Sequence, residues 1–303
     1  MIAGTRHTSF LSDDPLDGFI SGDVFARFNL AERKEIAEEE SRRVSLGDDG
    51  IPRPRIMTMN VHGPTPPKGG TAAMRKTMLQ MILDQAKPDI ILMQEMQWIG
   101  LSDHLDLSFS TPSRRYKCIR NKMGISKPPF YGRKMVDLKS RMEIALLTPQ
   151  VDAIRYRHIS SGPIFAVSFH GVSNGNAALC VQQMIRFLDR FARRVSEPII
   201  IGGDWNEDIR DLELPTGASL CTSGGVRRFD TMIDHFLSFN CGTRLGCTQT
   251  VSFFDEDGQL NRNVFTAEDW KRLEDTARGS EKEMYVWEDT LDHDPIFAIM
   301  GDE

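Results

Sequence analysis

The sequence has no long hydrophobic run and no recognisable secretory signal. None of its apolar stretches approaches the ~20 residues that a membrane-spanning helix needs. Residues 1–7 also lack the charged segment followed by an apolar segment with which a signal peptide begins. We therefore expect a soluble protein, cytoplasmic or nuclear by default, with export by another route left open.

Cysteine is scarce and irregularly spaced. The five cysteines are an odd number, and no two of them form a Cys-x-x-Cys pair. This pattern argues against a disulfide framework and against a cysteine-bound zinc ion, and it makes a reducing compartment the default expectation. The sequence also has no internal repeat and no low-complexity segment, which excludes repeat architectures.

What is present is an ordinary globular composition with unevenly placed charge. At 303 residues, 40% hydrophobic and 26% charged, the chain can hold one large α/β domain or two small ones. The net charge is −6, yet residues 114–141 hold ten Lys or Arg against one acid, Asp137. One concentrated basic stretch in a mildly acidic chain fits a polyanionic ligand bound at a single face.

The first 50 residues differ from the rest. They hold eleven acids against six bases, and residues 31–43 combine strong helix formers with mixed charges, which predicts an exposed helix. Glycines and prolines between residues 47 and 54 then break this helix. We predict an N-terminal appendage over residues 1–53, partly helical or disordered, and a folded domain over residues 54–303.

From residue 54 onward, predicted strands and helices alternate. The strands are expected at 55–61, 90–94, 143–148, 164–170, 198–202, 232–239 and 296–300, and the helices at 71–86, 177–195 and 266–277. Ile199, Ile200 and Ile201 show no polar alternation, which indicates a strand covered on both faces. The fold class predicted from this order is α/β.

Acids and amides stand where several of these strands end. Glu95 follows the apolar strand 90–94, so its carboxylate faces the rim of a sheet, where it can ligate Mg²⁺. Asp204 and Asn206 lie two residues apart and therefore share one face of an extended chain. Asp204 can hold an attacking water, and Asn206 can donate to a phosphate oxygen. The alternatives are a helix-capping or exposed acid at Glu95 and a simple Asp-x-Asn turn.

Two histidines and an acid within an apolar strand complete the set. His293 precedes the last predicted strand, and His170 ends another. Histidine is the usual general acid or base near neutral pH, although either residue alone is compatible with a structural role. A buried Asp234 needs a partner, and orienting a catalytic histidine is one such role. His235 faces the opposite way, and we assign it a structural role.

The basic stretch also carries aromatic side chains. Tyr116, Phe130 and Tyr131 are interleaved with its cations, a combination suited to phosphate contacts and base stacking. A solvated surface loop is the alternative. If the ligand is DNA, the predicted substrate-binding residues are Arg114, Arg115, Lys117 and Arg120.

Taken in order, these segments resemble the endonuclease/exonuclease/phosphatase family, which has the deoxyribonuclease I-like fold. The matching residues are Asn60 and Gly63 (N-x-x-G), Glu95 (Q-E), Asp204 and Asn206 (G-D-x-N), Asp234 (I-D-x-hydrophobic), Asp292 and His293 (S-D-H) and Arg141, before the central strand. The resemblance spans residues 55–300 and implies a four-layer sandwich of two packed mixed β-sheets flanked by helices.

The resemblance also implies the chemistry of the site. Mg²⁺, with Mn²⁺ or Ca²⁺ as substitutes, would be held by Glu95, Asn60 and Asp292. The implied catalytic residues are His170, Asp204, Asn206, Asp234, His293 and Arg141. Which histidine acts as base and which as acid is left open.

The segment 170–177 is most similar to the cytolethal distending toxin B subunit branch. The C-D-R segment of inositol polyphosphate phosphatases is absent, and Asn206 is followed directly by Glu207 and Asp208 where a basic residue is expected. Leu291 stands where serine or threonine is usual, and Trp205 stands where phenylalanine is usual. These departures leave the residues with chemical roles in place.

We therefore predict a Mg²⁺-dependent phosphodiesterase that acts on DNA, in the first instance an endonuclease. A phosphatase that acts on phosphoinositides or another small phosphate ester uses the same site chemistry and is the main alternative. A non-catalytic binding protein of the same fold is disfavoured, because every site position holds a competent residue.

Overall fold

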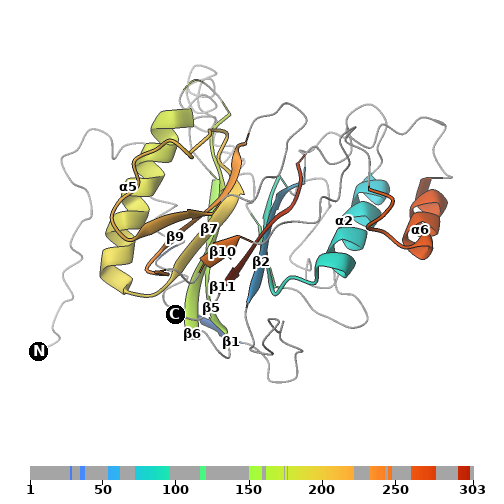
Figure 1. Cartoon of the computed structure of the whole chain (residues 1–303), viewed down its shortest axis with the longest axis horizontal. Helices are drawn as coiled ribbons and strands as arrows, with labels where there is room; N and C mark the ends of the chain where they lie inside the picture. Colours follow the sequence, from blue (N-terminus) through green and yellow to red (C-terminus); the bar gives the residue numbers. More distant parts are fainter. Residues whose placement is uncertain are drawn as a thin grey trace, which may run out of the picture.

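Two β-sheets packed face to face form the centre of the protein (Figure 1). The structure is a computed structural model, and it describes residues 28, 35–37, 54–61, 72–95, 117–120, 150–158, 162–173, 175, 177–221, 232–242, 245–247, 261–277 and 293–300. Its strands are β1 Glu35–Ala37, β2 Arg55–Asn60, β3 Ile90–Gln94, β4 Lys117–Arg120, β5 Gln150–His158, β6 Gly162–His170, β7 Ile199–Asp204, β8 Ala218–Cys221, β9 Asp234–Phe239, β10 Leu245–Cys247 and β11 Ile296–Met300. The helices are α2 Ala72–Ala86, α5 Ala177–Val195 and α6 Ala267–Ala277.

Each sheet is mixed, and each carries helices on its outer face. The first sheet has six strands in the order β1-β5-β6-β7-β9-β8, and the second has five in the order β10-β11-β2-β3-β4. In Figure 1, α5 covers the outer face of the first sheet, while α2, with α6 beyond it, covers the second. The four layers confirm the predicted α/β sandwich.

The apolar side chains of each strand divide between two cores. Ile199 and Ile201 of β7 pack against α5, whereas Ile200 packs between the sheets. Successive side chains of a strand point to opposite faces, so every position of a strand that is buried on both faces favours an apolar residue. This burial explains the unbroken isoleucine run.

The helix predicted over residues 31–43 is wrong at Glu35–Ala37, which form β1 beside β5. Pairing with the edge of β5 supplies backbone hydrogen bonds, and such tertiary contacts override the helix propensity of a short segment. Phe28 also packs onto the domain, with its ring 4.8 Å from Phe187 and 4.9 Å from Phe191 of α5. The domain boundary near residue 54 stays a prediction.

Several of the other predicted strands and helices are confirmed. The strand 90–94 and the helix 177–195 are confirmed with their bounds, and the helix predicted at 266–277 is α6, Ala267–Ala277. The strand predicted at 143–148 lies outside the described residues. Among the described helices, none is long and apolar enough to cross a membrane.

The cysteines have mixed states. Cys180 and Cys241 are buried thiols outside any disulfide, and burial raises the pKa of the Cys180 thiol to about 11, so this side chain behaves as an apolar core residue. Cys221, at the end of β8, is disulfide-bonded. The spacing of the five cysteines did not predict this bond.

Candidate active site

A row of three polar residues crosses the first sheet at one end. His170 on β6 lies opposite Asp204 on β7, which in turn lies opposite Asp234 on β9. Phe169, which precedes His170, and Trp205, which follows Asp204, belong to the outer core beneath α5. By alternation, the row therefore faces inward, toward the second sheet.

The second sheet brings its own polar residues to the same place. Asn60 ends β2, and Glu95 directly follows β3. The side-chain amide of Asn60 donates to Glu95 Oε1 at 3.2 Å and, across the gap between the sheets, to Asp204 Oδ2 at 2.9 Å. The site is therefore built by both sheets, and Asn60 joins the two halves.

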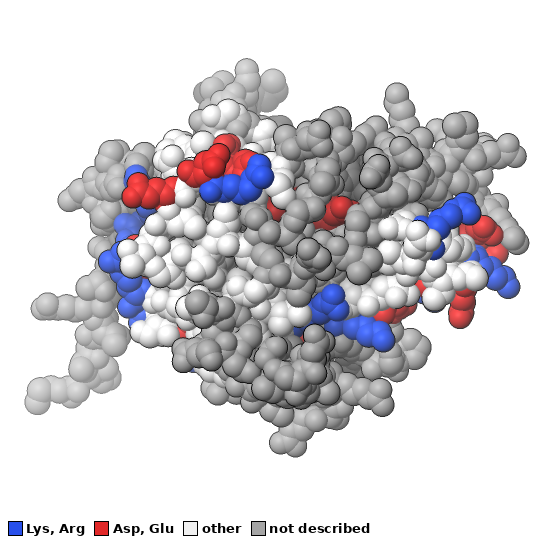
Figure 2. Space-filling view, viewed as in Figure 1, with Lys and Arg blue, Asp and Glu red and all other residues white. Residues whose placement is uncertain are grey.

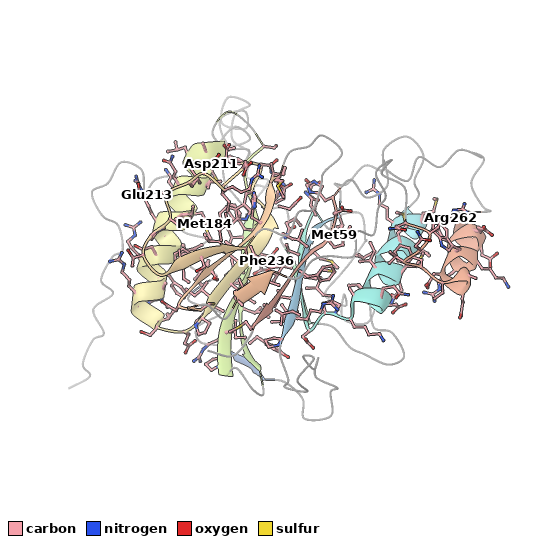
Figure 3. All side chains as sticks on the ribbon, in the orientation of Figure 1. Met59, Met184, Asp211, Glu213, Phe236 and Arg262 are labelled. Atoms are coloured by element: carbon pink, nitrogen blue, oxygen red, sulfur yellow. The ribbon has the colours of Figure 1, made fainter. Side chains whose placement is uncertain are left out.

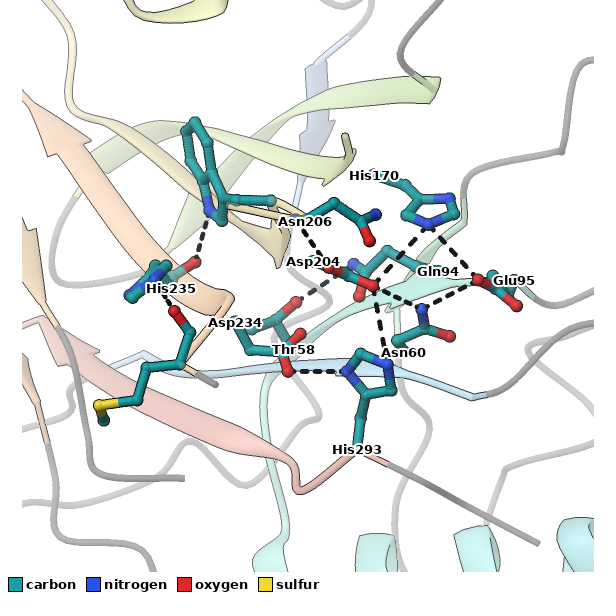
Figure 4. Close-up of polar contacts among 12 residues, drawn as sticks. Thr58, Asn60, Gln94, Glu95, His170, Asp204, Asn206, Asp234, His235 and His293 are labelled. Atoms are coloured by element: carbon teal, nitrogen blue, oxygen red, sulfur yellow. Dashed lines mark hydrogen bonds and ion pairs between the residues drawn. The ribbon is translucent and has the colours of Figure 1, made fainter. Parts of the chain in front are cut away.

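Asp204 is the centre of this arrangement (Figure 4). Its Oδ2 atom lies 3.6 Å from His293 Nε2 and 3.8 Å from His170 Nε2, and the residue is only 1% exposed. His170 Nε2 is also 3.4 Å from Glu95 Oε1. A buried carboxylate between two imidazoles can accept a proton or hold a water that is about to lose one.

Asp234 orients His293. Their Oδ2 and Nδ1 atoms lie 2.7 Å apart, and because an ionised carboxylate only accepts hydrogen bonds, the proton resides on Nδ1 of the imidazole. The Nε2 atom, which faces Asp204, is then the ring nitrogen that can exchange a proton with a reacting group. The partner expected for Asp234 is therefore present, while its catalytic role stays a prediction.

Two site residues adopt a left-handed backbone. Glu95 has φ 57° and Asn206 has φ 52°, a region that residues other than glycine rarely occupy. Asn206 is held there because its backbone N–H donates to Asp204 Oδ1 at 2.9 Å and its side-chain amide donates to the Gly171 carbonyl at 3.0 Å. Backbone strain of this kind persists where the surroundings enforce it, and it is common at functional sites.

Close backbone packing explains the glycine before Asp204. A Cβ atom on Gly203 would lie 1.8 Å from the Phe169 carbonyl oxygen, far inside van der Waals contact. Only glycine lets β7 approach β6 this closely, so Gly203 fixes the distance between His170 and Asp204.

A buried polar cluster lies between the sheets beneath the site. The side-chain amide of Gln94 donates to Thr58 Oγ1 at 3.2 Å and to Ser168 Oγ at 3.0 Å, and the Ser168 hydroxyl donates to the Met93 carbonyl at 3.0 Å. Sequence reasoning missed this cluster. The signal for it was a polar residue on the inner face of each of three otherwise apolar strands.

The half-buried Asp294 and the buried His235 are two further titratable groups next to the site. Burial and, to a smaller extent, the nearby Asp234 carboxylate raise the pKa of Asp294 to about 7, although His293 acts in the opposite direction. Burial lowers the pKa of His235 to about 4, and its Nε2 atom lies 2.9 Å from the Met232 carbonyl. The packing of His235 agrees with the structural role predicted for it.

The surface segment that follows Asn206 does not carry an excess of basic residues. Arg210 donates to Asp208, and this hydrogen bond holds the pKa of the carboxyl at about 2. Figure 2 shows acidic and basic atoms side by side in this region, where Figure 3 labels Asp211 and Glu213. The described residues that follow Asn206 therefore add no basic surface to the site.

Six of the predicted site residues are not placed in the structure or are placed by their backbones alone. Asp292, Arg141, Arg114 and Arg115 lie outside the described residues. The backbones of Lys117 and Arg120 lie on β4, where Arg120 is opposite Met93, two residues before Glu95. Within the basic stretch, residues 117–120 therefore form a strand beside β3, and the substrate contacts expected of the stretch stay a prediction.

The donor set of the site suits a divalent cation. Among the described residues, two groups have ligand atoms that all lie within 4.8 Å of one another: Glu95, His170 and Asp204, and Asp204, Asp234 and His293. Carboxylate oxygens are the ligands that Mg²⁺ prefers, and Mn²⁺ accepts both oxygen and imidazole.

Sequence similarity to a known protein family extends over most of the chain. The profile of the family described as Endonuclease/Exonuclease/phosphatase matches residues 57–280, which is well over half of the chain. No curated protein matches the sequence.

Solved structures that are similar to this chain include three of known source. TDP2 from C. elegans is 14% identical, with 95% of this chain and 83% of that chain covered and a TM-score of 0.47. D. rerio TDP2 complexed with single strand DNA product is 12% identical, with 82% and 99% covered and a TM-score of 0.48. The Haemophilus ducreyi cytolethal distending toxin is 10% identical, with 82% and 98% covered and a TM-score of 0.41.

Proposed function

We propose that the chain, which belongs to the endonuclease/exonuclease/phosphatase family, is a Mg²⁺-dependent phosphodiesterase that cleaves DNA as an endonuclease. Membership of this family supports the assignment of a hydrolase that acts on phosphoesters. The observation that carries the proposal is the position of Asp204 Oδ2, 3.6 Å from one imidazole and 3.8 Å from another. Hydrolysis of a phosphodiester needs a group that takes a proton from water and a group that protonates the leaving oxygen. The two histidines on either side of Asp204 can supply both.

Mg²⁺ would be held by Glu95, with Asn60 and Asp292 assisting and with Mn²⁺ or Ca²⁺ as substitutes. When bound, the ion would neutralise negative charge on the phosphate and on the leaving oxygen. The amide of Asn60 already ties Glu95 to Asp204 through hydrogen bonds of 3.2 and 2.9 Å, so the carboxylates are held together before any ligand arrives. Such preorganisation is what a charge-stabilising site requires.

The chain's own residues divide the proton transfers. His293, with Nδ1 bound to Asp234, suits the role of base, because the carboxylate stabilises the imidazolium that forms when Nε2 takes a proton. Asp204 would position the water. His170 would then protonate the leaving oxygen, and Asn206 and Arg141 would neutralise charge on the phosphate.

The proposal of DNA as substrate rests on the basic stretch 114–141. Its first described residues form β4, an edge strand beside β3, and Glu95 follows β3 directly. Cations that begin on this strand would reach a long polyanion bound across the site, whereas a small phosphate ester would not need them. The residues proposed to contact the DNA are Arg114, Arg115, Lys117 and Arg120.

Plasmid nicking tests the proposal. Purified protein with Mg²⁺ should convert supercoiled DNA to the open circular form, and His170→Ala and His293→Ala should each slow this conversion by at least about 100-fold. Arg193→Ala is the matched control, because Arg193 is an exposed α5 residue paired with Asp189. Phosphate release from phosphoinositides without DNA cleavage would replace the nuclease by the phosphatase. Inactivity on both substrates would contradict the proposed chemistry.

A further inference from the structure

Trp205 holds the backbone on both sides of Asp234. Its backbone N–H donates to the carbonyl of Ile233 at 2.7 Å, and its indole N–H donates to the carbonyl of His235 at 3.1 Å. These two carbonyls belong to the residues immediately before and after Asp234. One side chain and its own main chain therefore bracket the acid that orients His293.

The carboxylate of Asp234 has little else to hold it. Its Oδ2 atom contacts His293, and its Oδ1 atom is buried with no hydrogen-bond partner among the residues that the structure describes. With a single hydrogen-bond partner, the carboxylate depends on packing and on the position of its backbone for the rest of its orientation. The direction in which Asp234 presents Oδ2 to His293 therefore depends on the two carbonyls that Trp205 binds.

Trp205 is itself rigidly placed. It is fully buried, and its ring lies 4.6 Å from that of Phe169, the residue before His170. A Cβ atom on Gly171 would lie 2.2 Å from the Trp205 carbonyl oxygen, so the backbone is closely packed there as well. The indole is thus fixed against the His170 side of the site and bonded to the Asp234 side.

We propose that Trp205 is a positioning residue, and that its indole N–H sets the orientation of Asp234 and, through Asp234, that of His293. The inference rests on the proposed function for its catalytic consequence but not for its geometry. An aromatic ring alone would fill the same space. The specific contribution of tryptophan is a donor for the His235 carbonyl, which a phenylalanine at position 205 lacks.

The test is Trp205→Phe, which keeps a ring and removes the indole N–H. Loss of one neutral hydrogen bond should lower kcat about fivefold to tenfold and leave KM unchanged. Trp270→Phe is the matched control, because the Trp270 indole N–H is buried on α6 without a hydrogen-bond partner in the described part of the chain. Replacement of Trp205 by the isosteric benzothienylalanine repeats the test if the phenylalanine variant does not fold.

A double-mutant cycle separates positioning from packing. In an Asp234→Asn background, Trp205→Phe should change kcat by less than about twofold, because the group it positions is already gone. Full additivity of the two losses would show that Trp205 acts independently of Asp234 and would overturn the inference.

A second readout does not need activity. We expect the hydrogen-bonded Nδ1 proton of His293 to give a downfield NMR resonance, which its loss in Asp234→Asn would assign. We expect this resonance to shift in Trp205→Phe and not in Trp270→Phe; an unchanged resonance would refute the positioning role. If the wild-type protein cleaves no phosphoester, the proposed function fails, while this resonance still decides the inference.

Discussion

Replacing Asp294 by asparagine should stabilise the protein at neutral and alkaline pH. Asp294 lies beside His293, and burial together with the Asp234 carboxylate raises its pKa from 3.8 to about 7. The native protein therefore keeps this carboxyl protonated at pH values where the unfolded chain has ionised it. Asparagine is neutral and of the same shape, so the variant has no such difference between its two states.

The sign and size follow from proton linkage. Between pH 3.8 and about 7 the native state binds more protons than the unfolded state, so the free energy of unfolding falls as the pH rises through this window. The interval of about 3 pH units, at about 1.4 kcal/mol per unit, gives a loss of about 4 kcal/mol for the wild type. For a domain of this size that corresponds to a melting temperature about 10 °C lower.

Thermal melts with EDTA at pH values from 4 to 8 check this prediction. Wild type and Asp294→Asn should melt close together at pH 4 and separate progressively, with the variant higher at pH 8. Asp211→Asn, at an exposed position of the loop after β7, is the control and should follow the wild type. Parallel curves for wild type and Asp294→Asn across the whole range would refute the linkage argument.

Three further changes probe the site and its support. Asp234→Asn should lower kcat by about 100-fold or more at unchanged KM in plasmid nicking, because His293 loses its orienting acceptor; equal activity would exclude the proposed pair. Gln94→Ala should lower the free energy of unfolding by about 1–3 kcal/mol in urea titrations, since it leaves two buried hydroxyls without their donor. Gly203→Ala should fail to give soluble native protein, whereas Gly175→Ala, with nothing within 4 Å of its added methyl, should fold normally, as judged by circular dichroism. Native behaviour of Gly203→Ala would contradict the close approach of β6 and β7.

Local patterns were sufficient for the elements that are long or fully buried. The apolar run of β3 has the length of a strand and the apolar spacing of α5 has the period of a helix, so both elements could be predicted with their bounds. The helix predicted over residues 31–43 shows the opposite case. Its segment β1 is short, and the edge of β5 decides its conformation. Short strands such as β8 and β10 carry too few residues to show a period.

The site was predictable as a set of residues but not as a geometry. The order of the motifs identified Asp204, His170 and His293. It did not show that both imidazoles approach the same carboxylate oxygen of Asp204, because this contact depends on how the strands pair and how the two sheets pack. The role inferred for Trp205 was hidden for the same reason, because the His235 carbonyl that it binds lies 30 residues away. Contacts of this kind depend on strand pairing, which single-segment patterns do not encode.

The Mg²⁺ dependence of DNA cleavage by wild type and Glu95→Gln tests the central claim most directly. Glu95 lies 3.4 Å from His170 and accepts a hydrogen bond from Asn60, so the substitution leaves its neighbours in place while removing the charge proposed to hold the ion. We predict cleavage by wild type with Mg²⁺ and none with EDTA, and a requirement for about 10- to 100-fold more Mg²⁺ in Glu95→Gln. Cleavage that persists in EDTA, or the same Mg²⁺ requirement in both proteins, would contradict the account.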